Sequence, residues 1–190
     1  THVFLDSRTL EYTHIPFKQN DLCFIVTDSN IPRSSMEIDF TEQREHCRQC
    51  VEILTRRNGG TALRDFSVSD LQQGMGLIPE NVRRSSLHVV EENARVLLGK
   101  EMLERGDMAA FGKLMNRSHE SLRDLYEVTC PELDWLVKRA MEVEGVLGSR
   151  MTGVGFGGCT VTLLPKSKIE EYKQKLEDYE RIFGFQPLVY

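Results

Sequence analysis

Four glycines fall within six residues of this sequence, at Gly153, Gly155, Gly157 and Gly158. Glycine inside a regular strand or helix is destabilising because it loses more backbone freedom than other residues, so this cluster indicates positive φ angles or a close approach of two backbones. Three local structures meet that requirement: a tight hairpin turn, tight packing of one backbone on another, or a loop lying against a phosphate group. Residues 153–158 are called the glycine strip below.

The glycine strip also matches the pattern GxGxxG through Gly153, Gly155 and Gly158. In dinucleotide-binding folds this pattern follows a strand and opens a helix within a βαβ unit. Here residues 147–152 and 159–164 both read as strands, so the strip joins two strands and the dinucleotide-binding interpretation is excluded.

Hydrophobic periodicity predicts the remaining elements. The predicted strands are residues 2–6 and 12–17 as a hairpin, 22–27 and 186–190. The predicted helices are residues 41–57, 69–73, 81–105, a helix from 107 onward, one from 131 that ends by 145, and 169–182. This order of strands, helices, a hairpin, a helix and a strand predicts an α+β fold. We expect a mostly antiparallel sheet with helices packed on one side.

Two helix boundaries carry clear signals. Gly106 is placed to end the helix 81–105, and Asp107 to cap the next one, so the two helices should form an antiparallel pair. The segment Thr129–Glu132 has capping-box spacing and an early proline. A single apolar stripe is expected on the helix 81–105, made of Leu87, Val90, Ala94, Leu97, Leu98 and Met102.

Composition excludes several classes of protein. A net charge of -5 argues against a nucleic-acid-binding protein, and no apolar run reaches the ~18 residues that a membrane span needs. Five scattered cysteines suit reduced thiols in a cytoplasmic protein. The pair Cys47-x-x-Cys50 invites a zinc or redox interpretation, but a second ligand pair is missing and buried thiols are favoured. For His88 and His119 a packing or capping role is favoured over a general base.

The glycine strip and its flanks, GSRMTGVGFGGCTVTL over residues 148–163, closely resemble the third signature motif of galactokinases, which are members of the GHMP kinase family. Other galactokinase-like strings follow one another along nearly the whole chain: FLDSRTLE at 4–11, TDSN at 27–30, HVVEENAR at 88–95, SHESLRD at 118–124 and YEVTCPELD at 126–134. The resemblance implies that residues 21–190 form a GHMP kinase C-terminal domain. Residues 1–20 are expected to belong to an amino-terminal domain.

The resemblance also implies what lies elsewhere. In galactokinases the sugar-recognition motif, the phosphate loop and the catalytic aspartate come before the position that corresponds to Thr1. No catalytic residue and no metal ligand is therefore assigned in this sequence. The chain is expected to be a piece of a longer protein and to be inactive alone. ATP and Mg should be bound mainly by that amino-terminal part. The glycine strip, including Phe156, should lie near the phosphates.

Two departures from the family pattern concern the substrate. Val154 stands where galactokinases usually have Gly or Ala, and its branched side chain limits backbone freedom. Phe40 aligns with the tyrosine that contacts the sugar, and it keeps the ring while lacking the hydroxyl. Three hypotheses follow: a galactokinase producing galactose 1-phosphate, an N-acetylgalactosamine kinase, and a non-catalytic sensor that binds galactose and ATP and regulates transcription.

Overall fold

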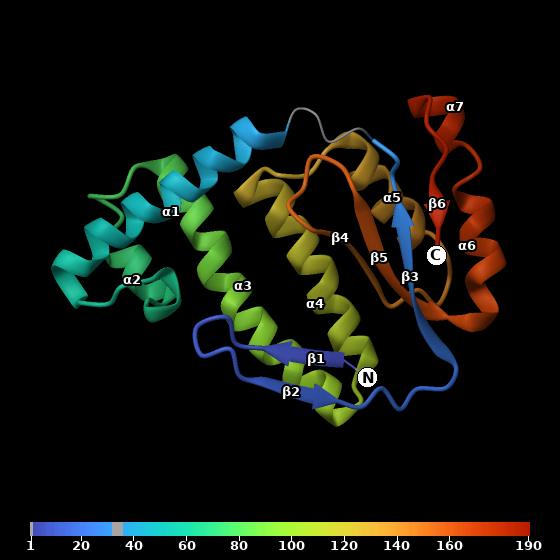
Figure 1. Ribbon diagram of the computed structural model, residues 1–190, viewed down its shortest axis with the longest axis horizontal. Helices are drawn as coiled ribbons and strands as arrows, with labels where there is room; N and C mark the ends of the chain where they lie inside the picture. Colours follow the sequence, from blue (N-terminus) through green and yellow to red (C-terminus); the bar gives the residue numbers. More distant parts are fainter. Residues whose placement is uncertain (1, 32–35) are drawn as a thin grey trace.

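The computed structural model describes residues 2–31 and 36–190; the side chains of residues 36–40 and 58 lie outside this description (Figure 1). Figure 1 shows a helical region at one end of the molecule and the main sheet at the other, with long helices running between them. The strands are β1 His2–Leu5, β2 Tyr12–Ile15, β3 Leu22–Asp28, β4 Gly148–Thr152, β5 Cys159–Pro165 and β6 Leu188–Val189. The α-helices are α1 Met36–Asn58, α2 Val68–Gln73, α3 Glu80–Arg105, α4 Met108–Ser121, α5 Pro131–Met141, α6 Ile169–Lys175 and α7 Tyr179–Phe183.

The sheet has the strand order β4-β5-β3-β6 and every pairing in it is antiparallel. Successive side chains of a strand point to opposite faces, so Leu164 and Ile25 lie on one face. There they join a core with Leu136, Tyr172 and Tyr179 from α5, α6 and α7. The predicted α+β class with an antiparallel sheet is confirmed, and α5, α6 and α7 cover this face of the sheet; Met108 and Met115 of α4 pack against the opposite face.

The helix α4 runs along the outer edge of β4 at backbone contact. A Cβ added at Gly112 would lie 2.2 Å from the carbonyl oxygen of Leu147, and one added at Gly148 would lie 2.2 Å from the oxygen of Gly112. Two glycines facing each other therefore let helix and strand approach more closely than any other residue pair would permit. This contact fixes the start of the strand that leads into the glycine strip.

The predicted hairpin is confirmed: β1 pairs antiparallel with β2. It lies across α3 and α4 in Figure 1. Its turn is joined to the short 3₁₀ turn Leu63–Asp65 by two reciprocal ion pairs, Arg64–Asp6 at 2.6 Å and Arg8–Asp65 at 2.8 Å. The hydrogen bond from Arg64 holds the pKa of Asp6 below its usual range.

The junction between α3 and α4 is as predicted. Gly106 adopts a left-handed φ of 74°, and the Asp107 side chain accepts from the Ala110 amide. The apolar stripe predicted for α3 is wrong in its second half, where Leu97 and Leu98 are 61% and 43% exposed. The buried positions of α3 are instead Val82, Ser85, Ser86, His88, Val90 and Gly99. Small and polar side chains fill this face because α1 and α4 pack closely against it.

Three other local predictions need correction. The helix expected over 169–182 is two helices, because the amides of Leu176, Glu177 and Tyr179 bond to carbonyls three residues back and form a turn. The capping box expected at 129–132 is absent: Cys130 is the N-cap and its side chain makes no capping bond, although Pro131 opens the helix as predicted. The helix expected to begin at 41 begins at Met36.

Among the described residues, no helix is long and apolar enough to cross a membrane.

Candidate functional site around the glycine strip

The glycine strip connects β4 to β5 through left-handed backbone. Its four glycines have φ angles of 87°, 100°, 141° and 82°, and Phe156 between them has a φ of 54°. Such conformations are readily available to glycine and strained for other residues. Because the chain continues directly into the strand β5, the exclusion of a dinucleotide-binding loop is confirmed.

One side of the strip is bonded to the segment between α4 and α5. The Phe156 amide donates to the Val128 carbonyl at 2.7 Å. A Cβ at Gly155 would lie 2.1 Å from the same oxygen. Phe156 also packs into a small core with Val128, Leu133 and Met151. Of the three structures considered for the glycines, tight packing of two backbones is therefore present at Gly155.

The other side of the strip lies beside the end of β3. The Ser29 amide donates to the Gly158 carbonyl at 2.9 Å, and Gly157 faces Ile31. The Tyr179 hydroxyl donates to the Ser29 carbonyl at 3.0 Å and so ties this segment to α7. Two of the motifs singled out in the sequence, Thr27–Asn30 and the glycine strip, are thus neighbours. Before these two anchors the strip has an open part, where Val154 is exposed and a Cβ at Gly153 would meet no described atom within 4 Å.

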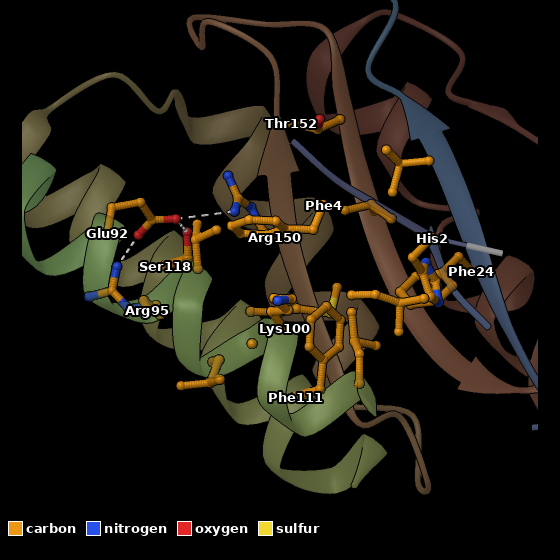
Figure 2. Close-up of a pocket in the computed structure, with 18 residues that line it drawn as sticks. His2, Phe4, Phe24, Glu92, Arg95, Lys100, Phe111, Ser118, Arg150 and Thr152 are labelled. Carbon is orange, nitrogen blue, oxygen red and sulfur yellow. Dashed lines mark hydrogen bonds and ion pairs between the residues drawn. The ribbon is translucent and has the colours of Figure 1, made fainter. Parts of the chain in front are cut away.

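A cluster of charged side chains lies behind β4 (Figure 2). Arg150 of β4 contacts Glu92 of α3 with 3.3 Å between Nη1 and Oε1. Glu92 also accepts from Ser118 of α4 and pairs with Arg95. Burial lowers the pKa of the Arg150 guanidinium, and the nearby Glu92 carboxylate opposes that effect. The carboxylate is therefore the shared counter-ion of two arginines.

This cluster forms one wall of a cavity of about 380 Å³ under the hairpin. Phe4, Phe24 and Phe111 also line the cavity, and Figure 2 shows Phe24 and Phe111 away from the charged cluster. Sequence reasoning missed the cluster, although Glu92 and Arg95 stand in the quoted segment 88–95. The acidic and basic residues of a helix usually face solvent, and nothing local to that segment marks Arg150 as their partner.

The two histidines singled out in the sequence are both buried. The ring of His88 stacks on Tyr126 with 4.6 Å between centroids, and its Nδ1 lies 2.8 Å from the Ser121 hydroxyl. Burial lowers the pKa of His88 to about 4. His119 Nδ1 accepts from the Met151 amide at 3.3 Å. Both rings pack between secondary-structure elements, as the favoured interpretation predicted.

Cys50 is fully buried and Cys47 is half-buried on α1. Burial raises the pKa of both thiols, that of Cys47 to about 11, so both are protonated near neutral pH. This agrees with the prediction of buried thiols.

Within the described part of the chain, no three His, Cys, Asp or Glu side chains gather as a metal site.

Phe40, the predicted sugar-contacting residue, lies on α1, but its side chain is outside the described residues. The structure therefore leaves its place relative to the glycine strip as a prediction.

Comparison with known proteins agrees with this geometry. Residues 100–181 match the family described as GHMP kinases C terminal. The galactokinase of Roseiflexus sp. (strain RS-1) is 41% identical over 175 residues, which are 92% of this chain and 44% of that protein. The galactokinase of Homo sapiens is 41% identical over 177 residues, 93% of this chain and 44% of that protein.

Among solved structures, that of Lactococcus lactis galactokinase complexed with galactose superposes with a TM-score of 0.93 at 32% identity, covering 99% of this chain and 49% of that one. The chain is thus similar in sequence and in fold to members of the GHMP kinase family. Within that family it is similar, over nearly its whole length, to the carboxyl-terminal part of galactokinases. It spans slightly less than half the length of these relatives.

Proposed function

We propose that this chain is the carboxyl-terminal part of a galactokinase, which transfers the γ-phosphoryl group of MgATP to the anomeric hydroxyl of galactose and forms galactose 1-phosphate. The observation that carries the proposal is the joint match in sequence and fold to galactokinases, with 41% identity to one relative and a TM-score of 0.93 to another. The motif GVGFGG lies in that match as a loop anchored on both sides.

The glycine strip acts as a brace in this proposal. Phosphoryl transfer depends mainly on positioning and charge stabilisation, so a loop beside the phosphates must hold one conformation. The contact of Gly155 with Val128 and the bond from Ser29 to Gly158 hold the base of the loop. The open part at Gly153 and Val154 is left to contact a phosphate loop.

In this proposal an amino-terminal domain supplies the phosphate loop, the catalytic aspartate and most contacts to ATP and Mg. Residues 1–20 would pack with that domain and residues 21–190 would form the C-terminal domain. Exposed apolar side chains on the hairpin support this division: Val3, Leu5, Leu10 and Tyr12 are each more than half exposed. Large apolar patches of this kind are typical of interaction surfaces. A cytoplasmic location is part of the same proposal.

Phe40 favours one second candidate, an N-acetylgalactosamine kinase. Its ring can stack on a sugar face but offers no hydroxyl for a hydrogen bond. This choice concerns the substrate and leaves the reaction unchanged.

The test is an ADP-release assay on the full protein that contains this chain, with galactose and N-acetylgalactosamine as alternative substrates. We expect turnover of galactose, and no turnover by residues 1–190 alone. In the Phe40→Tyr variant, restoring one hydroxyl should change the sugar KM about 2- to 10-fold, the equivalent of one hydrogen bond. Turnover of N-acetylgalactosamine alone would support the second candidate. Binding of galactose and ATP without turnover would support the non-catalytic sensor instead.

A further inference from the structure

The outer edge of β4 has its amides bonded to side chains of α4. The Ser149 amide donates to Asn116 Oδ1 at 2.8 Å, and the Met151 amide donates to His119 Nδ1 at 3.3 Å. Positions 116 and 119 are three residues apart and so lie on one helical face. An edge strand normally leaves such donors for water or another strand. Here a helix satisfies two of them immediately before the glycine strip.

His119 is itself held from the opposite side by α5. Because Nδ1 accepts a hydrogen bond, the proton of the neutral ring is on Nε2. Nε2 lies 3.1 Å from Asp134 Oδ1, although the two groups are not aligned for a hydrogen bond. His119 is only 3% exposed, so its ring is almost entirely surrounded by protein. Three elements are thereby connected in a row: α5 through Asp134, α4 through His119, and β4 through Met151.

Asp134 also contacts the residue next to Val128, the anchor of Phe156 in the strip. The Thr129 hydroxyl donates to Asp134 Oδ2 at 3.3 Å. Thr129 follows Val128, whose carbonyl accepts from Phe156 inside the strip. One carboxylate therefore contacts His119, which holds Met151 just before the strip, and Thr129, the neighbour of the residue that holds Phe156 within the strip. Ordinary protection of an edge strand would not require this second connection.

We propose that His119, held by Asp134, is a positioning residue that sets where the glycine strip lies. The inference rests on the proposed function, because the strip matters to catalysis only if it braces the phosphates. Displacement of the strip should lower kcat and raise the KM for ATP, and should leave the KM for galactose nearly unchanged.

The test uses two isosteric replacements in the full protein. His119→Asn keeps an oxygen near the place of Nδ1, where it can still accept from Met151. His119→Gln keeps a polar group near the place of Nε2 and leaves the Met151 amide without an acceptor. We expect kcat to fall about 10- to 100-fold in His119→Gln, the effect of a displacement near 1 Å. The Asn variant should recover most of that loss. His46→Gln, a change on α1 away from the strip, is the matched control for replacing a histidine and should keep kcat within about 2-fold.

A second readout separates failure of this inference from failure of the proposed function. Amide hydrogen exchange at Met151 and Phe156 should accelerate in His119→Gln relative to His119→Asn, whether or not the protein is a kinase. Equal exchange and equal kcat in the two variants would overturn the inference. Should His119→Gln fail to fold, Asp134→Asn replaces it; faster exchange at both amides is then expected, and unchanged exchange would again overturn the inference.

Discussion

Gly155 lies so close to Val128 that a Cβ added to the glycine would stand 2.1 Å from the Val128 carbonyl oxygen. That distance is far inside van der Waals contact, and the obstacle is backbone that cannot rotate away. The φ of 100° at this position adds a second restriction. Position 155 is thus limited to glycine for two separate reasons, conformation and space.

Gly155→Ala should therefore lower the free energy of unfolding by about 3 kcal/mol or more, the combined effect of backbone strain and overpacking. Gly153→Ala is the matched control. Its φ is also positive, at 87°, but nothing described lies within 4 Å of the added carbon. The free energy of unfolding of Gly153→Ala should fall only by the cost of the positive φ, about 1–2 kcal/mol. Urea unfolding measures both variants, and equal losses would show that the Val128 contact is not limiting.

The contact between α4 and β4 leads to a second prediction with an opposite-signed control. Gly112→Ala would place a carbon 2.2 Å from the Leu147 oxygen, so we expect a loss of several kcal/mol or failure to fold. Gly99→Ala, in α3, meets Phe111 at an ordinary 3.4 Å and should stabilise by about 0.5–1 kcal/mol through helix propensity. Thermal unfolding of the two variants shows whether each substitution lowers or raises the stability. Two stabilising changes would contradict the close approach at Gly112.

The shared carboxylate of Glu92 gives a third prediction. Glu92→Gln removes the carboxylate that pairs with Arg150 and leaves Arg95 with Glu91 alone; for this partly exposed site we expect a loss of about 1–3 kcal/mol. In the double variant Glu92→Gln/Arg150→Met the arginine that would lack a partner is also removed. The loss of unfolding free energy in the double variant should therefore be smaller than the sum of the losses in the two single variants. A double-mutant cycle by urea unfolding measures this coupling. Strict additivity would mean that the two side chains do not stabilise each other.

The elements that carry strong local signals could be predicted from the sequence. Gly106 and Asp107 identify a helix boundary by themselves, and the continuous apolar run at 22–26 identifies the buried strand β3. Four glycines within residues 153–158 indicate positive φ angles or a close approach of two backbones, and the structure has both. In each case the physical cause lies within a few residues of the chain.

What could not be predicted depends on contacts between distant segments. Leu97 and Leu98 belong to the predicted helical stripe, yet no element in the described part of the chain covers their side of α3, and they stay exposed. The partnership of Glu92 with Arg150 joins residues 58 positions apart, and the bond from Met151 to His119 joins residues 32 apart. Periodicity indicates which face of a helix is apolar, but it does not indicate which strand will lie beside it.

His88 provides the last prediction, a dependence of stability on pH. Burial lowers the pKa of its ring from 6.5 to about 4; Glu92 raises the pKa, while Arg95 and Arg150 lower it further. As the pH falls below 6.5, the unfolded chain takes up a proton at this position while the folded protein does not. The unfolded state is thereby favoured, so stability declines between pH 6.5 and about 4 and this contribution levels off below that.

The decline should reach roughly 2–3 kcal/mol near pH 4, as expected for a shift of this size in a buried group. His88→Gln has no proton to take up, and its curve of unfolding free energy against pH should fall less steeply over the same interval. Urea unfolding at closely spaced pH values between 7.5 and 4.5 gives both curves, and their difference cancels the carboxylates that titrate in each protein. Because the ring lies against Tyr126 and Ser121, the variant will also lose some stability at every pH. The gap between the curves must therefore narrow as the pH falls, and a constant gap would show that His88 is protonated as easily in the folded protein as in the unfolded chain.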